Sequence, residues 1–251
     1  MGAILPMDVR QLERLKQEIV RFMMMYKFAI EELRTKIEIL QQEFHYIHDY
    51  NPIEHITSRV KSPESILQKA HRKGIPLSLP SIRENIRDIA GLRIVCAFVS
   101  DIYKVSEMLH NQSELVVAEC KDYIKHPKPN GYRSLHLIVQ VPVFMSDHTE
   151  KVWAEIQIRT IAMDFWASLE HKLNYKYNYQ IPEPLLNELR AAAESIALLD
   201  EKMERINQEA NHFKATLQSE TELQELWLNN QRYHLPADFL NMLLDSDSRR
   251  K

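Results

Sequence analysis

Glycine is scarce in this chain, with 4 residues among 251. Loops that hold phosphates with backbone N–H groups need several glycines close together, so a glycine-rich phosphate loop is not expected. Phosphate groups would instead be held mainly by lysine and arginine side chains. The formal net charge is only -3 at pH 7, so any basic binding site has to be local and is not a property of the whole surface.

Cysteine is also scarce, and long apolar runs are missing. Cys96 and Cys120 are the two cysteines, and Cys96 lies in the apolar run Leu92–Val99, which favours a buried, reduced thiol. No apolar run approaches the roughly 20 residues that span a bilayer. The first residues lack the pattern of a secretory signal. We therefore expect a cytoplasmic protein with no membrane partner.

Long helices are predicted at both ends of the chain. Apolar residues recur at alternating spacings of three and four from Leu12 to Phe44 and again from Leu185 to Leu217. Asn51 and Pro52 end the first helix. Apolar stripes of this length need a partner, which is either the sheet of the same chain or another subunit. The pattern alone leaves these two possibilities open.

The middle of the chain alternates short strands with helices. Strands are predicted at 92–99, 115–120, 135–141 and 152–158, with helices at 63–73 and 101–110. Gly74, Pro76 and Pro80 indicate a loop. The expected fold class is α+β, a mixed β-sheet flanked by helices. The predicted segments are an N-terminal helical part at 1–50, a core at 51–180, a C-terminal helical part at 181–217, and a tail at 218–251 with a short helix near 236–244.

The last predicted strand carries polar side chains on one face. Alternation places Val152, Ala154, Ile156 and Ile158 on one side, and Trp153, Glu155, Gln157 and Arg159 on the other. A carboxylate, an amide and a guanidinium on one face can bind a metal, position a substrate and balance phosphate charge. The alternative is a strand with a solvated polar face.

The strand runs into a helix with a predicted apolar stripe of Ile161, Phe165, Leu169 and Leu173. Its polar side holds Asp164, Ser168, His171 and Tyr175. These residues either line a pocket or form the edge of an amphipathic helix. We favour the edge for Asp164 and leave His171 open.

Three further segments carry candidate binding residues. Ser65, Lys69 and Arg72 share one helix face, where crowded positive charge favours an anion such as a nucleoside triphosphate; the alternative is a solvated basic face. Asp88 precedes an apolar strand and is either a Mg²⁺ ligand or a turn aspartate.

The third segment is the turn Asn130-Gly131, which leads into a strand and presents Tyr132 at its mouth. An exposed tyrosine ring there can stack on a base. Alternatively, the ring packs over the turn. His136, taken alone, is more typical of a structural histidine.

Taken in order, these segments resemble the synthetase domain of the RelA/SpoT family. The matching blocks are the pattern R-x-K-x-x-x-S-x-x-x-K at 59–69, RDIAGLRIVC at 87–96, KPNGYRSLH at 128–136 and EIQIR at 155–159. The resemblance implies a nucleotidyltransferase-like synthetase fold. It also implies a GTP diphosphokinase of the stringent response, which transfers the β,γ-pyrophosphate of ATP to the 3′ hydroxyl of GDP or GTP and releases AMP.

The resemblance also assigns roles to single residues. Arg59 and Arg93 would enclose adenine, and the triphosphate would be bound by Lys61, Ser65, Lys69 and Arg72. Asp88 and Glu155 would hold Mg²⁺, with Glu155 also a candidate base for the 3′ hydroxyl. Tyr132 would stack on guanine in a GDP or GTP pocket that also contains Lys128, Asn130, His136 and Gln157.

The chain is too short for the hydrolase and regulatory domains of the large family members, and His48-Asp49 lacks a surrounding set of metal ligands. We therefore expect a small alarmone synthetase, a type that usually forms homotetramers. DNA and RNA are not predicted partners. One alternative is a catalytically silent nucleotide- or RNA-binding regulator. The other is a nucleotidyltransferase, which would release pyrophosphate in place of AMP.

Overall fold

The computed structural model describes residues 9–47, 50–177, 181–217, 225–228, 231–234 and 242. The helices are α1 (Val9–Ile47), α2 (Pro63–Arg72), α3 (Leu79–Asn85), α4 (Val99–His110), α5 (Ile161–Lys176) and α6 (Glu183–Leu217). The strands are β1 (His55–Val60), β2 (Ala90–Cys96), β3 (Val116–Asp122), β4 (Leu135–Phe144), β5 (Thr149–Thr160), β6 (Glu225–Leu228) and β7 (Gln231–His234).

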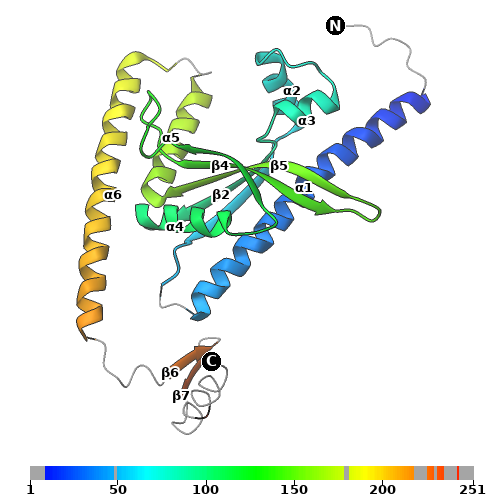
Figure 1. The fold of residues 1–251 in the computed structure, drawn as a ribbon. Coiled ribbons are helices and arrows are strands. Elements are labelled where there is room, and N and C mark those ends of the chain that lie inside the picture. Colours follow the sequence, from blue (N-terminus) through cyan, green and yellow to red (C-terminus); the bar gives the residue numbers. More distant parts are fainter. Residues whose placement is uncertain are drawn as a thin grey trace.

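Five of the strands form one sheet in the order β1-β2-β5-β4-β3. Figure 1 labels its three inner strands, β2, β5 and β4. β2 and β5 are parallel, and the other neighbouring strands are antiparallel. This mixed sheet with flanking helices confirms the predicted α+β class. The predicted division into four segments stays a prediction.

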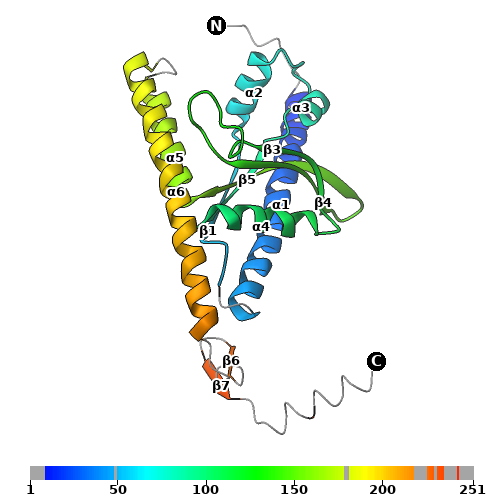
Figure 2. The ribbon, with the colours of Figure 1, turned by 60° about the vertical axis from the view of Figure 1, so that its left-hand side comes forward.

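The sheet has an apolar face and a polar face. Even-numbered residues of β2 and β5, such as Leu92, Ile94 and Ile156, are buried with side chains of α1 and α4 in one hydrophobic core. Because side chains alternate along a strand, the odd-numbered residues of the same strands point to the opposite face. Figures 1 and 2 show α1 crossing the sheet diagonally, with α5 and α6 side by side near one end of the strands.

The two long terminal helices differ in how much apolar surface they bury. From Phe22 to Phe44 the predicted stripe of α1 packs on the sheet, whereas Leu12 and Leu15 are exposed. Leu189 of α6 is buried, but Met203 and Ile206 of the same stripe are exposed. The described part of the chain therefore covers only part of each stripe.

The predicted apolar stripe of α5 was wrong. Ile161, Phe165 and Leu169 are exposed, and the buried side chains are those of Met163, Trp166 and Ala167, which follow a different face. The rotation of α5 is fixed by its tertiary contacts, since Trp166 Nε1 donates a 2.8 Å hydrogen bond to the backbone oxygen of Leu189 on α6.

Two short elements and one strand boundary also differ from the prediction. The expected loop containing Pro76 and Pro80 includes α3, whose cap is Ser78 and whose proline lies in the first turn, where a helix tolerates it. The edge strand β1 has no apolar run and was not predicted. The strand that was expected to reach residue 99 ends at Cys96, and helix α4 already begins at Val99.

In the tail, Trp227 lies on strand β6 of the β6–β7 hairpin. The predicted helix near 236–244 lies outside the described residues, apart from position 242. Within the described ranges, none of the helices combines the length and apolar character needed to cross a membrane.

A buried acid ties α6 to the end of β5. Asp200 accepts a 2.9 Å hydrogen bond from Thr160 Oγ1, and Thr160 in turn accepts one from the backbone N–H of Met163 and so caps α5. Burial raises the pKa of Asp200 to about 6. The group thus takes up its proton more readily in the folded protein than in the unfolded chain, where the pKa is about 3.9.

This shift predicts a pH-dependent stability. The contribution of Asp200 is fully present below about pH 4 and is lost as the pH rises through about 6, because only the folded state favours the protonated acid. Asp200→Asn, which resembles the protonated form, should match the wild type at pH 4 and melt at a higher temperature at pH 7.5. Thermal melting of both proteins between these pH values tests this. A constant difference in melting temperature would contradict it.

Candidate active site

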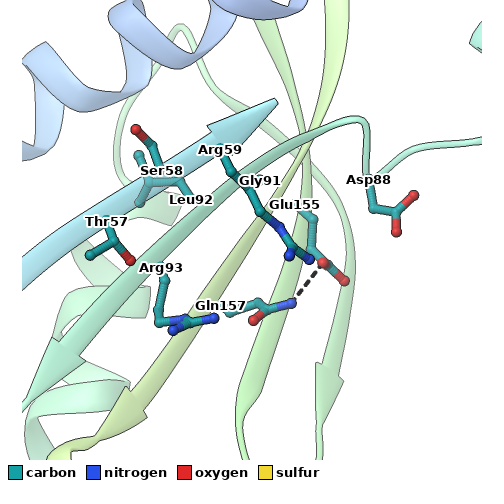
Figure 3. A pocket seen from close by; sticks show the side chains of 9 residues that line it. All are labelled: Thr57, Ser58, Arg59, Asp88, Gly91, Leu92, Arg93, Glu155 and Gln157. Carbon is teal, nitrogen blue, oxygen red and sulfur yellow. Dashed lines mark hydrogen bonds between the residues drawn. The ribbon is translucent and has the colours of Figure 1, made fainter. Parts of the chain in front are cut away.

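Three neighbouring strands build a pocket on the polar face of the sheet. Strand pairing sets Thr57 of β1 opposite Arg93 of β2, and Gly91 and Arg93 beside Glu155 and Gln157 of β5. These residues line one cavity together with Ser58, Arg59, Asp88 and Leu92. Figure 3 shows the side chains of Arg59, Glu155 and Gln157 converging in it, with Asp88 at its edge.

The side chain of Arg59 passes close to Gly91 on the neighbouring strand. Arg59 pairs with Gly91 in the β1–β2 ladder. A Cβ atom at position 91 would be 3.8 Å from Arg59 Cγ and 4.0 Å from its Nε. The aliphatic stem of Arg59 therefore lies within contact distance of position 91. The guanidinium of Arg59 reaches the pocket over this glycine.

A basic groove continues from the pocket toward α2. It begins at the end of β1 and runs along one face of α2, with Asp88 shared between the groove and the pocket. Its lining includes Arg59, Lys61, Ser62, Ser65, Gln68, Lys69 and Arg72. The helix starts here because Ser62 accepts a hydrogen bond from the backbone N–H of Ser65 and Pro63 occupies its first turn.

Asp88 holds the lysines of this groove. Its Oδ2 atom lies 2.8 Å from Lys61 Nζ and 2.5 Å from Lys69 Nζ. Burial alone would raise the pKa of Asp88, but the two ammonium groups more than offset it and the pKa lies below its usual value. The same burial lowers the pKa of Lys61.

The other oxygen of Asp88 is available to a ligand. Asp88 Oδ1 is buried and has no hydrogen-bond partner. Glu155 lines the same pocket, but the described residues contain no cluster of three or more potential ligands. Mg²⁺ prefers oxygen ligands and usually completes its shell with water and substrate phosphates. Two carboxylates beside a basic groove fit this ion.

Glu155 is held ionised by its neighbours. Its Oε1 lies 3.0 Å from His136 Nδ1, and its Oε2 accepts a 2.8 Å hydrogen bond from Gln157 Nε2. Burial raises the pKa of Glu155, but the contacts with His136 and Gln157 outweigh burial and keep that pKa below its usual value. A carboxylate at this place can accept a proton or coordinate a cation.

Five side chains form a closed ring of polar contacts. Tyr132 Oη lies 2.8 Å from His136 Nε2, and the other ring nitrogen of His136, Nδ1, lies 3.0 Å from Glu155 Oε1. Arg159 Nη2 donates to Tyr132 Oη at 3.1 Å and also to Gln157 Oε1. The ring thus returns to Glu155 through Gln157. It links the carboxylate to the tyrosine that the sequence places at the turn.

The aromatic ring of Tyr132 lies beside a lysine. Lys128 Nζ is 4.7 Å from the centroid of that ring and 4.6 Å from that of Tyr123. Trp166 of α5 packs on the same cluster, with its centroid 6.4 Å from that of Tyr132. Burial raises the pKa of Tyr132. A flat aromatic surface and an ammonium group suit a purine base better than an apolar ligand.

The turn before Tyr132 depends on Gly131. This residue has φ +90°, and a Cβ atom on it would lie 2.5 Å from the Cβ of Ala193 on α6. Gly131→Ala should therefore lower the free energy of unfolding by about 3 kcal/mol, combining an overpacked contact with an unfavourable backbone. Denaturant unfolding measures this loss.

Gly74 provides the matched control for that change. It has φ +64° but no atom within 4 Å of the added Cβ. Gly74→Ala should cost only about 1–2 kcal/mol, the backbone term alone. Equal losses at the two positions would show that the contact with α6 has no effect.

The structure brings the predicted site residues into two adjoining groups. The pocket and groove contain Arg59, Lys61, Ser65, Lys69, Arg72, Asp88, Arg93, Glu155 and Gln157. The tyrosine cluster contains Lys128, Tyr132 and His136, and Asn130 shapes the turn by accepting a hydrogen bond from the backbone N–H of Tyr132. Their binding roles stay predictions.

Several residues of the site were missed by sequence analysis. Thr57 and Gly91 line the pocket, and Tyr123 adjoins the predicted base site. Asp164, which we assigned to a polar helix edge, lies 3.1 Å from Arg93 Nη1. The position of Asp164 in the sequence, four residues after the end of β5, did not indicate its ion pair with Arg93. His171 is exposed, and the side chain of Tyr175 lies outside the described residues.

The chain is similar to a group of known proteins. Residues 58–180 match the model of the region found in RelA / SpoT proteins. The GTP pyrophosphokinase YwaC of Bacillus subtilis (strain 168) is 54% identical over 189 residues, covering 75% of this chain and 90% of that protein.

Two solved structures extend the similarity to the fold. Small alarmone synthetase 1 from Bacillus subtilis bound to its product pppGpp has a TM-score of 0.73 at 46% identity, covering 77% of this chain and 98% of that one. The same synthetase bound to AMPCPP has a TM-score of 0.69 at 43% identity, covering 78% and 99% of the two chains.

Proposed function

The chain belongs to the RelA/SpoT family and is a GTP pyrophosphokinase of the small alarmone synthetase type, and we propose which of its residues serve each step. The reaction transfers the β,γ-pyrophosphate of ATP to the 3′ oxygen of GDP or GTP. A bond forms between that oxygen and the β-phosphorus, and the bond from the β-phosphorus to the α,β-bridging oxygen breaks. AMP leaves with the bridging oxygen.

We propose that ATP occupies the pocket and the basic groove. Arg59 and Arg93 come from adjacent strands at the pocket, where planar guanidinium groups can stack on adenine. The triphosphate then extends along the groove, bound by Lys61, Ser65, Lys69 and Arg72. In this arrangement the phosphates replace Asp88 as the partners of the two lysines.

The residues that would hold Mg²⁺ are Asp88 and Glu155. Supporting this are the unpaired Oδ1 of Asp88 and the ionised carboxylate of Glu155 in the same pocket. The ion, when bound, would neutralise charge on the phosphates during transfer. Asp88 would fix the site at the junction between groove and pocket.

The acceptor nucleotide would bind at the tyrosine cluster. Guanine would stack on Tyr132, within reach of Lys128, Asn130, His136 and Gln157. Glu155 would accept the proton of the 3′ hydroxyl. Its carboxylate is held ionised by His136 and Gln157, and an ionised carboxylate can act as a base. The ring from Tyr132 to Glu155 would keep base and carboxylate at a fixed separation.

The observation that carries these assignments is the position of Asp88. It lies in both the basic groove and the pocket of Glu155, and one of its oxygens is committed to lysines while the other is unpaired. A triphosphate and a divalent cation are the ligands that together satisfy this pattern.

Product analysis tests the proposal. The protein is mixed with ATP, Mg²⁺ and either GDP or GTP, and the nucleotides are separated by anion exchange. We expect AMP and a guanosine product with two additional phosphates. Pyrophosphate in place of AMP would indicate nucleotidyl transfer, and no product with either acceptor would support a silent binding protein.

We also propose a homotetramer that acts in the cytoplasm, where ATP and GTP are made. The support for assembly is the uncovered apolar surface of Phe165, Met203 and Ile206. Light scattering after size exclusion should give four times the chain mass of 29.7 kDa. Phe165→Glu should shift the protein to smaller species. A monomeric wild type would overturn this part of the proposal.

A further inference from the structure

A charge contact joins helix α5 to the pocket. Asp164, in the first turn of α5, has its Oδ1 3.1 Å from Arg93 Nη1 and 3.5 Å from Arg159 Nη1. The carboxylate therefore lies between two guanidinium groups of the neighbouring strands β2 and β5. Figure 3 shows Arg93 at the pocket beside Gln157, so a contact made from α5 acts on a pocket side chain.

The two guanidinium groups need this counter-charge. The side chain of Arg159 is only 3% exposed, and the Nε atoms of Arg93 and Arg159 are buried without a hydrogen-bond partner. Burial lowers the pKa of Arg159 and the charge of Arg93 lowers it further, while Asp164 acts in the opposite direction. Like charges repel more strongly in a poorly solvated part of the protein than in water.

Without Asp164, the two guanidinium groups would repel each other, and the less firmly held one would move. Arg159 is fixed by its bonds to Tyr132 and Gln157. The side chain of Arg93 is 34% exposed, and within the described part of the chain its guanidinium is paired with Asp164 by charge, without a hydrogen bond to Asp164 Oδ1. Arg93 is therefore the group that would turn away from the pocket.

We propose that Asp164 is a positioning residue, which holds the Arg93 guanidinium in the orientation that stacks on the adenine of ATP. The inference rests on the proposed donor site. Asp164 does not line the pocket itself and acts through Arg93. It also connects the donor side of the site to the ring around Glu155, because the same carboxylate faces Arg159.

Binding of AMPCPP, an ATP analogue, tests this role. With Mg²⁺ present, calorimetry should show that Asp164→Asn weakens binding about fivefold, the scale of one partly exposed ion pair. Arg93→Ala should weaken binding at least as much, and adding Asp164→Asn to Arg93→Ala should change nothing further. In turnover, KM for ATP should rise while kcat and KM for GDP stay within about twofold.

Two variants separate positioning from folding. Asp164→Glu keeps the charge and should bind AMPCPP within about twofold of the wild type. Glu150→Gln removes a carboxylate from Arg83, outside the pocket, and should have no effect. If Asp164→Asn melts too low to assay, Asp164→Ala carries the same expectation, because position 164 lies inside α5, after its cap Thr160, where alanine is the best helix former.

The outcomes distinguish this inference from the donor site on which it rests. Unchanged AMPCPP binding in Arg93→Ala would overturn the proposed adenine site, and the inference with it. Weaker binding in Arg93→Ala but unchanged binding in Asp164→Asn would overturn only the positioning role. So would a loss from Asp164→Asn that is equally large in the Arg93→Ala background.

Discussion

Glu155→Gln should lower the rate of pyrophosphate transfer by about 10³-fold, since it removes a proton acceptor and a metal ligand at once. The amide is the same size as the carboxylate. One of its ends becomes an N–H donor that faces His136 or Gln157, so the ring loses one hydrogen bond but no packing. Steady-state synthesis from ATP and GDP measures the loss.

The loss from Glu155→Gln should fall on turnover and leave nucleotide binding largely intact. GDP binding should stay within about threefold of the wild type, because that carboxylate is proposed to act on the reacting hydroxyl. Glu114→Gln is the matched control: Glu114 pairs with Lys36, and it lines neither the pocket nor the groove. Full activity in Glu155→Gln would exclude Glu155 from the reaction.

Asp88→Asn should produce opposite effects on binding and on turnover. Lys61 and Lys69 lose their internal counter-ion, so AMPCPP should bind about threefold to tenfold more tightly in EDTA than it binds to the wild type. Turnover should fall by about 10²–10³-fold, because the metal site loses a charged ligand. Calorimetry with and without Mg²⁺, and product formation, measure the two effects.

The dependence on Mg²⁺ decides between the two roles of Asp88. In the wild type, Mg²⁺ should strengthen AMPCPP binding, and in Asp88→Asn this gain should largely disappear. Asp147→Asn, which changes an exposed carboxylate paired with His148, should behave like the wild type. An equal gain from Mg²⁺ in all three proteins would show that Asp88 does not bind the ion.

The fold class and most elements of the core follow from local patterns. Alternation along 152–158 identified the buried and polar faces of β5, and both match the burial in the structure. Ser62 and Pro63 marked the start of α2. These signals are local, since a strand repeats every two residues, a helix every 3.6, and a cap acts within one turn.

Elements without a strong local pattern were not predicted. The edge strand β1 has a mostly exposed sequence and is defined by its pairing with β2. Helix α3 contains a proline that reads as a loop signal unless its serine cap is recognised. Hydrophobic periodicity shows neither the pairing that defines β1 nor the first-turn position of the proline in α3.

The sequence by itself determined which residues are candidates for the chemistry: a carboxylate and an amide on one face of β5, a serine, a lysine and an arginine on one face of α2, and a tyrosine after a tight turn. The tertiary structure decided which of them meet. Strand register places Arg93 beside Gln157, and α5 rotates so that Asp164 faces Arg93 while Phe165 is exposed. Register and rotation depend on contacts between residues far apart in the chain, which no local period encodes.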